Sequence, residues 1–272
     1  MSEIVCDICY RHCHLKEGMR GFCRARKNVN GENICDTYGR ITSLALDPIE
    51  KKPLAMFHPG SCILSVGSYG CNLSCPFCQN WQISMTDERS VGYETLSAEE
   101  LAALILRDPD NLGIAFTYNE PMIAWEYIID VARLIQPEGK QVVLVTNGCV
   151  NESVLEKLAP WVDAMNIDLK GDASFYQELG GDYETVKHTI AYMQDKCHVE
   201  ITSLIIPGKN DREEWVEQEA QWLASLNPDI PLHITRYFPN WKYAIPATPR
   251  SAVFHLRDAA AKHLHHVFVG NV

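Results

Sequence analysis

Three cysteines lie within eight residues of one another between Cys71 and Cys78, in the spacing C-x-x-x-C-x-x-C with Cys75 in the middle. The apolar residues 63–66 before them predict a short buried strand, and Gly67 and Gly70 allow the following loop to curl around a bound group. Thiolates select iron–sulfur clusters, zinc or copper(I). A closed cluster or a structural zinc site takes four protein ligands, so three thiols predict an iron–sulfur cluster with one iron left open. A zinc site completed by a distant ligand is the alternative.

A second group of thiols lies near the N-terminus and consists of Cys6, Cys9, Cys13 and Cys23. Gly18 and Gly21 lie in the connection that precedes the fourth thiol. Four thiolates at close spacing favour a closed tetrahedral site for structural zinc or a single iron. A second iron–sulfur cluster and unligated thiols are the alternatives. His12 and His14 flank the third cysteine, and we expect them to be solvated rather than to replace a thiol.

Composition and charge limit the class of protein. The chain has 272 residues, of which 46% are hydrophobic, as in globular proteins with a large core. The formal net charge of −11 disfavours nucleic acid as a partner, because phosphates attract basic surfaces. The sequence shows neither a signal peptide nor an apolar run of about 18 residues, which predicts a cytoplasmic protein without membrane spans. In a reducing compartment the eleven cysteines are expected to be metal ligands or buried thiols.

Strand and helix patterns alternate over residues 61–272 and predict six parallel β/α units. The predicted strands cover residues 62–66, 113–118, 142–145, 164–169, 199–206 and 232–237. Six units are too few for a full eight-fold barrel, so we predict a partial (β/α)6 barrel of the TIM type. Residues 1–60 are predicted as a small cysteine-rich cap, stapled by metal, with short strands at 34–38 and 41–46 about Gly39 forming a β-hairpin.

Polar residues follow the predicted strands at their carboxyl ends, where parallel α/β sheets place their chemistry. They are Tyr118-Asn119-Glu120-Pro121 after the second strand, Thr146-Asn147-Gly148 after the third, Asp168 and Lys170 at the fourth, and Arg236 at the sixth. The cysteine loop follows the first strand. One mouth of the barrel therefore collects thiols, acids, amides and two cations.

Each of these motifs also has a structural interpretation. The stretch 119–121 suits a helix start, where an acidic first turn complements the helix dipole, and 146–148 suits an ordinary turn. Asp168 and Lys170 alternate along a strand and also fit a partly exposed edge pair. His233 also fits a core histidine with satisfied hydrogen bonds.

The cysteine loop, including Phe77 before its last thiol, resembles the signature of the radical S-adenosylmethionine (radical SAM) superfamily. The later motifs are similar to those of pyruvate formate-lyase activating enzymes, namely 118–121, 146–148, Asn166-Ile167-Asp168-Leu169-Lys170-Gly171, Ile206-Pro207-Gly208-Lys209-Asn210-Asp211 and His233-Ile234-Thr235-Arg236-Tyr237. Together with the N-terminal cysteines and residues 45–54, the chain looks most like the radical SAM member of the AmmeMemoRadiSam system.

The resemblance implies cofactors and residue roles. Cys71, Cys75 and Cys78 would hold a 4Fe–4S cluster whose fourth iron takes the amino and carboxylate groups of S-adenosylmethionine (SAM). Asn119 and Glu120 would bind the amino group of SAM. The residues expected around its carboxylate and ribose are Thr146, Asn147, Asp168 and Lys170. The residues expected beside its adenine are Phe77, Ile206, Val269, Gly270 and Asn271, while His233 and Arg236 would face the ribose or the substrate.

The implied activity is reductive cleavage of SAM to a 5′-deoxyadenosyl radical, which abstracts hydrogen from a substrate. A reductant such as flavodoxin or ferredoxin would supply the electron, and the lateral gap of a partial barrel would admit even a protein substrate. One alternative is an activating enzyme that generates a glycyl radical on a partner enzyme. The others are an RNA-modifying radical SAM enzyme, which the acidic balance disfavours, and a non-catalytic iron–sulfur protein.

Overall fold

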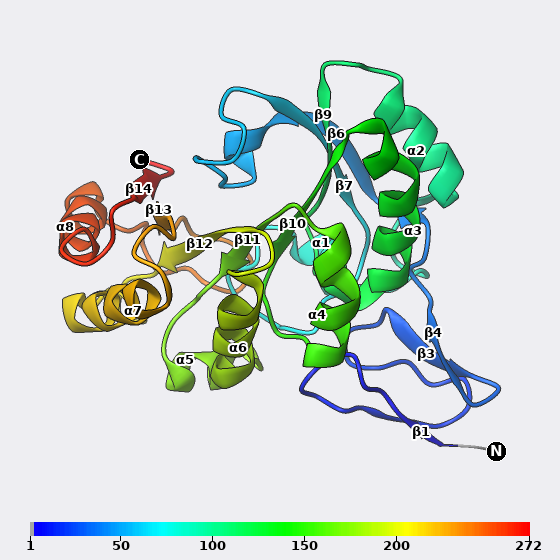
Figure 1. Ribbon diagram of the computed structural model, residues 1–272. Coiled ribbons are helices and arrows are strands. Elements are labelled where there is room, and N and C mark those ends of the chain that lie inside the picture. Colours follow the sequence, from blue (N-terminus) through cyan, green and yellow to red (C-terminus); the bar gives the residue numbers. More distant parts are fainter. Residues whose placement is uncertain (1–2) are drawn as a thin grey trace.

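A curved eight-stranded sheet forms the centre of the molecule in the computed structural model, which describes residues 3–272 (Figure 1). Its strand order is β14-β13-β12-β11-β10-β9-β7-β6. All neighbours from β7 to β14 are parallel, and β6 pairs antiparallel with β7 at one edge. The six β/α units predicted from the sequence are therefore present, and β14 adds a further parallel strand after the last helix.

The elements have the following bounds. The sheet consists of β6 (Ser43–Pro48), β7 (Cys62–Gly67), β9 (Asn111–Phe116), β10 (Gln141–Thr146), β11 (Ala164–Asp168), β12 (His198–Ile205), β13 (Leu232–Arg236) and β14 (Val267–Gly270). The α-helices are α1 (Trp81–Ser84), α2 (Ala98–Leu106), α3 (Trp125–Ile135), α4 (Glu152–Leu158), α5 (Ala173–Leu179), α6 (Tyr183–Met193), α7 (Glu213–Leu226) and α8 (Arg250–Ala260). Short 3-10 helices cover Ile49–Lys51, Pro121–Ala124, Gln136–Glu138 and Ala159–Trp161.

The helices form where the sequence supplies caps and one apolar face. In α2, Ser97 Oγ accepts the amide of Glu100, and the Glu100 carboxylate accepts the amide of Ser97, which is the capping box that the sequence predicts. Leu101 and Ile105 are fully buried on its inner face. None of the helices in residues 3–272 combines the length and apolar character that crossing a bilayer requires.

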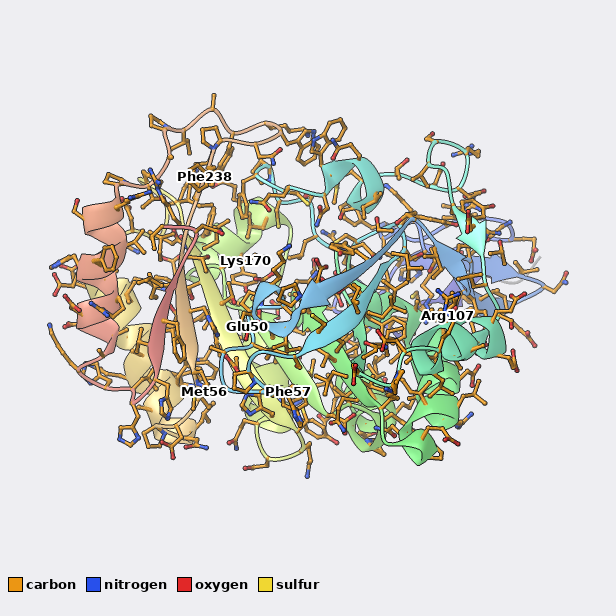
Figure 2. The ribbon with its side chains drawn as sticks, turned by 90° about the horizontal axis from the view of Figure 1, so that it is seen from above. Glu50, Met56, Phe57, Arg107, Lys170 and Phe238 are labelled. Atoms are coloured by element: carbon orange, nitrogen blue, oxygen red, sulfur yellow. The ribbon has the colours of Figure 1, made fainter. Side chains whose placement is uncertain are left out.

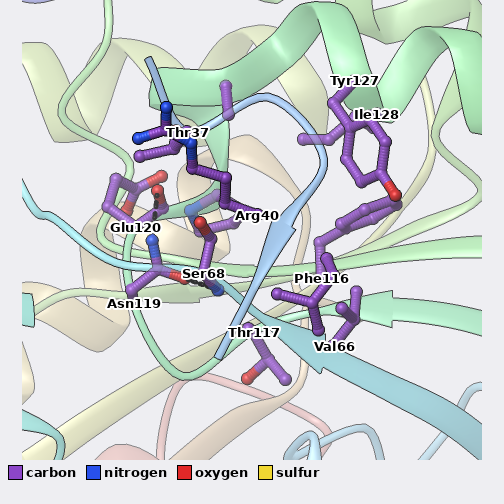
Figure 3. Close-up of a pocket in the computed structure, with 14 residues that line it drawn as sticks. Thr37, Arg40, Val66, Ser68, Phe116, Thr117, Asn119, Glu120, Tyr127 and Ile128 are labelled. Carbon is purple, nitrogen blue, oxygen red and sulfur yellow. Dashed lines mark hydrogen bonds between the residues drawn. The ribbon is translucent and has the colours of Figure 1, made fainter. Parts of the chain in front are cut away.

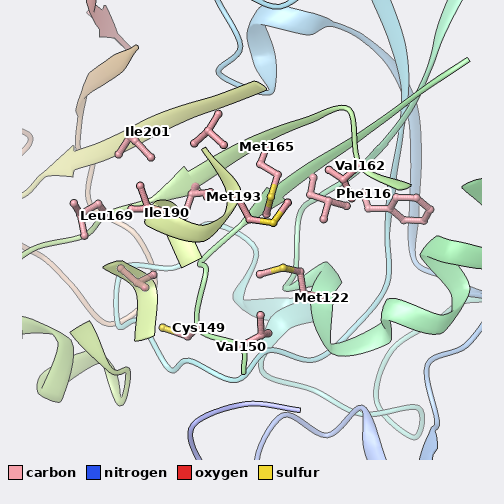
Figure 4. Close-up of a cluster of buried hydrophobic side chains, with 14 of the residues drawn as sticks. Phe116, Met122, Cys149, Val150, Val162, Met165, Leu169, Ile190, Met193 and Ile201 are labelled. Atoms are coloured by element: carbon pink, nitrogen blue, oxygen red, sulfur yellow. The ribbon is translucent and has the colours of Figure 1, made fainter. Parts of the chain in front are cut away.

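The main apolar core lies between the sheet and its covering helices. Figure 4 shows Met165 of β11 and Ile201 of β12 close to Ile190 and Met193 of α6. The central strands are buried on both faces, which is why a run such as Val142-Val143-Leu144 is continuously apolar instead of alternating. Burial of this kind stabilises the fold by roughly 25 cal/mol per Å² of apolar surface.

Residues 49–57 close the barrel interior at the amino ends of the strands. Ile49 and Leu54 are fully buried against the inward-facing Ile63, Ala115, Val143 and Ala164. The Glu200 carboxylate of β12 accepts the amides of Ala55 and Met56 at 2.9 and 2.8 Å. In Figure 2, Met56 and Phe57 lie at the opposite end of the strands from Phe238, with Lys170 between them. This plug fills the barrel interior at the amino ends of the strands, so the interior opens at their carboxyl ends.

The N-terminal segment pairs differently from the prediction. Its hairpin joins β3 (Arg26–Val29) to β4 (Glu32–Cys35) through Asn30 and Gly31, whose φ values of 55° and 85° suit a tight two-residue turn. The strands predicted about Gly39 do not pair with each other. Instead, β5 (Arg40–Ile41) pairs with β8 (Glu94–Thr95), and β6 joins the main sheet, so the sheet takes in part of the stretch that the sequence assigned to the cap. A two-residue strand pair, β1 (Ile4–Val5) with β2 (His14–Leu15), precedes them.

A buried carboxyl group lies behind the sheet, away from the barrel interior. Glu219 of α7 is 3% exposed, and its Oε1 lies 2.5 Å from Ser203 Oγ, which also donates to the carbonyl of Leu169 at 2.9 Å. One hydroxyl hydrogen cannot serve both oxygens, so Glu219 itself must carry a proton when both contacts are satisfied. Burial raises the pKa of Glu219 to about 8, which agrees with a neutral carboxyl group.

We expect Glu219→Gln to stabilise the protein at neutral pH. The unfolded carboxyl ionises near pH 4.5 whereas the folded one stays protonated up to about pH 8, so wild-type stability falls as pH rises between these values. An amide cannot ionise and keeps the contact with Ser203. The gain in unfolding free energy should be roughly 1 to 3 kcal/mol at pH 7 and should vanish below about pH 4.5. Urea unfolding at several pH values measures it, and an unchanged pH dependence would contradict the assignment.

Candidate active site

The three cysteines of the loop after β7 all line one cavity at the carboxyl ends of the strands. The cavity has a volume of about 290 Å³ and is bordered by Cys71, Cys75 and Cys78 together with residues of β10, β11, β12 and β13. Gly70 has φ +86°, and a Cβ on it would lie 2.3 Å from the carbonyl oxygen of Cys23. Only glycine therefore allows the loop to turn here and pass so close to the N-terminal segment.

The environment of these thiols is enclosed and contains one cation. Burial raises the pKa of the Cys75 thiol to about 12, and Lys170 partly opposes this shift. Burial also raises the pKa values of Cys71 and Cys78. The free thiols are therefore neutral at physiological pH, and a metal must displace their protons to bind.

Three thiols on one curled loop fit a cubane cluster, in which each thiolate binds a different iron. Within residues 3–272 no three Cys, His, Asp or Glu side chains surround one point closely enough for a single metal ion. That spacing does not test a cluster, because its ligands remain apart from one another. The backbone amide of Leu73 donates to Cys71 Sγ at 3.4 Å and the Asn147 amide group approaches the same sulfur at 3.5 Å, as suits a thiolate. The donor set thus fits an iron–sulfur cluster.

Asn119, which follows β9, holds the backbone that leads into the cysteine loop. Its Oδ1 accepts the amide of Ser68 at 2.9 Å, and its Nδ2 donates to the carbonyls of Gly70 and Tyr69 at 3.1 and 3.3 Å. Asn119 lines the cavity, but its amide is already engaged with the protein backbone. The preceding Tyr118 adopts φ +70°, and its hydroxyl donates to Asp47 at 2.9 Å. The geometry makes Asn119 a positioning residue for the first thiol.

Glu120 connects the ends of β9 and β10. It is 1% exposed, and its Oε1 accepts the Met122 amide at 2.9 Å and the Thr146 hydroxyl at 2.7 Å, while Oε2 accepts the Asn147 amide at 2.8 Å. Burial raises the pKa of Glu120 to about 7, although these three donors favour its ionised form. Asn147 in turn donates to Asn72 Oδ1 at 2.9 Å. A chain of hydrogen bonds therefore links Glu120 to the cysteine loop.

A second, much smaller cavity of about 30 Å³ lies on the other side of Glu120 and also borders Asn119 (Figure 3). Arg40 and Ser68 lie near the carboxyl group, while Phe116 and Tyr127 border the rest of the space. The Arg40 guanidinium is engaged by the Tyr69 hydroxyl at 2.6 Å. This small and largely apolar space agrees with the desolvation of Glu120 on that side.

Asp168 and Lys170 form an ion pair at the end of β11. Lys170 Nζ lies 2.7 Å from Asp168 Oδ2, and both residues line the main cavity. Burial alone would lower the pKa of Lys170, but Asp168 and Cys75 raise it, so the ammonium remains charged. The cavity thus offers a fixed positive charge beside two thiols and a carboxylate that faces them.

The structure places some of the predicted cofactor residues in the cavity and others outside it. Phe77, Thr146, Asn147 and Asn271 line it. The cavity lining found in residues 3–272 does not include Ile206, His233, Arg236, Val269 or Gly270. Their predicted place beside SAM therefore stays a prediction: Ile206 is fully buried just after the end of β12, and Val269 and Gly270 lie along the edge strand β14.

His233 and Arg236 miss the cavity for different reasons. His233 points into the barrel but one layer lower, where its Nε2 lies 2.6 Å from Glu200 Oε2, so it is the satisfied core histidine of the alternative interpretation. Arg236 is three residues further along β13 and therefore faces the opposite side of the sheet, where its Nε donates to the Thr248 carbonyl at 2.7 Å. Thr235, between them in sequence, lines the cavity instead.

Several cavity residues were missed by sequence reasoning. Thr202 and Leu204 of β12 line the cavity, as do Pro53 of the plug and Asn80 after the last thiol. Side chains alternate along β12, so residues 200, 202 and 204 lie on the same face of the sheet. This alternation would have identified Thr202 and Leu204 as cavity residues. No local feature of the sequence marks Pro53 as a cavity residue, because it reaches the barrel interior as part of the plug at residues 49–57.

Comparison with known proteins agrees with this geometry. A family model described as the radical SAM superfamily matches residues 65–220. A protein of uncharacterized function from Methanocaldococcus jannaschii is 36% identical over 282 residues, which cover 100% of this chain and 82% of that protein. A candidate glycyl-radical enzyme activating enzyme of the same organism is 29% identical over 159 residues, which cover 54% of this chain and 62% of that protein.

A solved structure shares the fold. A domain of pyruvate-formate lyase-activating enzyme from Bacteroides vulgatus superposes with a TM-score of 0.52 and 19% sequence identity, over 58% of this chain and 99% of that chain. At this identity the likeness concerns the fold alone.

Proposed function

The chain belongs to the radical SAM superfamily, and from that membership we propose that it reductively cleaves SAM and uses the resulting 5′-deoxyadenosyl radical to abstract hydrogen from a substrate. The observation that carries the proposal is the convergence in one cavity of three loop thiols, a buried carboxyl group and an ion pair from neighbouring strands. A fold without this convergence would give the same parallel sheet but no site for the chemistry.

In this proposal Cys71, Cys75 and Cys78 hold a 4Fe–4S cluster. When bound, the cluster supplies the electron that breaks a carbon–sulfur bond of SAM. The protein supplies the binding, the orientation and the exclusion of water. Asn119 keeps the backbone of the cysteine loop in place, and Asn147 donates toward the sulfur of Cys71.

The remaining cavity groups suit the polar parts of SAM. Lys170 and Asp168 offer a cation and an anion for its carboxylate and hydroxyl groups, and Glu120 fixes Thr146 and Asn147 beside them. Phe77 packs near Phe175, with ring centroids 6.1 Å apart, and provides an aromatic surface for a base. The plug at residues 49–57 shields this interior from solvent at the opposite end.

A second candidate is an activating enzyme that transfers the radical to a glycine of a partner enzyme. The similarity to a candidate glycyl-radical enzyme activating enzyme favours it. Both candidates require a one-electron reductant such as flavodoxin or ferredoxin. Both also suit the cytoplasm, since thiols that bind a cluster must stay reduced.

Anaerobic reconstitution with iron and sulfide, followed by reduction with dithionite in the presence of SAM, tests the proposal. We expect 5′-deoxyadenosine and methionine to form, and a partner-dependent glycyl radical signal in electron paramagnetic resonance would select the activating enzyme. A protein that carries the complete cluster and binds SAM but forms no 5′-deoxyadenosine would contradict the enzymatic assignment.

A further inference from the structure

Four thiols of the N-terminal segment lie close together beside the cavity but do not line it. The Cys6 amide donates to the Cys13 carbonyl at 2.9 Å, Cys9 lies near enough to Cys6 and Cys13 for their charges to act on it, and Cys23 lies near Cys6 and Cys9 in the same way. A Cβ on Gly21 would lie 3.7 Å from Cys13 Sγ and 3.8 Å from Cys23 Sγ. A glycine at this position therefore leaves room between two of the sulfurs.

Backbone amides point at these sulfurs in a repeated pattern. The Cys6 thiol accepts the amide of Ile8, the Cys9 thiol that of Arg11, and the Cys23 thiol those of Ala25 and Arg26. Each of the three sulfurs thus receives the amide two residues ahead. Cys71 and Cys78 of the cluster loop receive the amides of Leu73 and Asn80 in the same way. A neutral thiol is a weak acceptor, so such amides suit a thiolate that binds metal.

The surroundings also place one ion pair and one amide donor beside these thiols. The buried Arg26 lies near Cys6 and Cys23, and its guanidinium is held by Glu126 with two contacts of 2.6 Å and by the Ile123 carbonyl at 2.7 Å. The Asn33 side chain donates to Cys6 Sγ at 3.4 Å. His12 and His14 are both exposed, as the sequence predicted.

We propose that Cys6, Cys9, Cys13 and Cys23 form a four-thiolate site for one divalent metal ion, zinc in the first place, and that this site anchors the cysteine loop of the cavity. In residues 3–272 the four sulfurs do not surround one point closely enough for a single metal ion, so the proposed site requires them to move closer together when the ion binds. Four thiolates complete the tetrahedral shell of zinc, which stabilises small segments that lack a core of their own.

The anchoring follows from direct contacts between the two cysteine segments. Arg11 Nε donates to the Asn72 carbonyl at 2.8 Å, and the Tyr10 hydroxyl lies 3.3 Å from the same oxygen while it donates to the nearer Gly180 carbonyl. Gly70 packs on the backbone of Cys23. Tyr10 and Arg11 lie between Cys9 and Cys13, so a metal that fixes these two thiols also fixes the side chains that hold the loop.

Asn72 extends this contact into the cavity. Its side chain donates to the Cys149 carbonyl at 2.7 Å, accepts from Asn147 at 2.9 Å and interacts with the Cys9 thiol. One residue therefore touches a thiol of the proposed site and the amide that approaches Cys71. The anchoring role rests on the proposed function of the loop, whereas the metal site itself does not.

The experiment isolates the site in the full chain with the Cys75→Ala replacement, which removes the loop cluster. Purified from medium containing zinc and iron, this variant should retain about one zinc or iron ion per chain, with no acid-labile sulfide. The added Cys9→Ala replacement should release that ion. The matched control is Cys35→Ala, because this partly buried cysteine of the same segment has Arg26 and Glu126 as its charged neighbours.

Hydrogen exchange of the loop tests the anchoring without any assay of SAM cleavage. In the Cys75→Ala background, Cys9→Ala should accelerate exchange of the Ser74 amide, which bonds to the Leu179 carbonyl, by at least about tenfold. Circular dichroism and exchange of β12 amides show whether the fold persists. A Cys75→Ala protein without bound metal, or one with iron and sulfide in equal amounts, overturns the site. Unchanged loop exchange after metal loss overturns the anchoring.

Discussion

Cys75→Ala is expected to reduce 5′-deoxyadenosine formation to below detection. Cys75 is the middle thiol of the loop, is 8% exposed and lies near both Lys170 and Cys78. Alanine removes one of only three protein ligands, and a cluster already open at one iron then has two, which does not retain it. The measurement combines iron and sulfide content, the visible absorbance of the reconstituted protein and chromatographic detection of the nucleoside.

The matched control for this prediction is Cys197→Ala. Cys197 is also a largely buried thiol, but it lies after α6 at the other end of the strands and its Sγ contacts the Met193 carbonyl at 3.8 Å. Its loss should cost a modest amount of stability, on the order of 1 kcal/mol, and leave iron content unchanged. If Cys75→Ala retained iron and the full rate, the ligand assignment would be wrong.

The parts of the fold that the sequence predicts are those with strong local patterns. Continuous apolar runs such as residues 142–145 marked the parallel strands, and the Ser97–Glu100 capping box marked the start of α2. The rule that polar residues collect beyond the carboxyl ends of such strands then placed Glu120, Asn147 and Lys170 in one cavity. These inferences succeed because backbone period and strand direction are set locally.

The errors arise where distant segments decide the outcome. Residues 49–61 turn the chain back after β6, so that the edge strand β6 pairs antiparallel with β7. No hydrophobic periodicity in the sequence reveals this pairing. Residues 49–57 also fill the lower barrel, and their amides at Ala55 and Met56 engage Glu200. The Glu200 carboxylate then holds His233 in that lower layer of the barrel. His233 is therefore kept out of the cavity, although its strand β13 ends there.

The second large effect is expected at Glu120, which organises the cavity from behind. The ionised Glu120 side chain accepts three hydrogen bonds and donates none. In Glu120→Gln one accepting oxygen becomes an amino group, which donates and therefore opposes the Thr146 hydroxyl or the Asn147 amide. A lost buried hydrogen bond to a charged group costs about 1.5 to 3 kcal/mol, which corresponds to roughly a ten- to hundredfold weaker affinity for SAM. Isothermal titration of SAM into the reconstituted protein measures this loss.

The pH dependence separates this role from general damage to the fold. Because the pKa of Glu120 is about 7 in the free protein, the wild type loses the accepting carboxylate as pH falls, and its SAM affinity should drop below pH 7. Glu120→Gln should bind weakly at every pH and show no step near 7. Glu219→Gln carries the same change at another buried carboxyl group, outside the cavity, and should keep the wild-type profile. A Glu120→Gln protein with wild-type affinity and an unchanged step would show that a group other than Glu120 titrates.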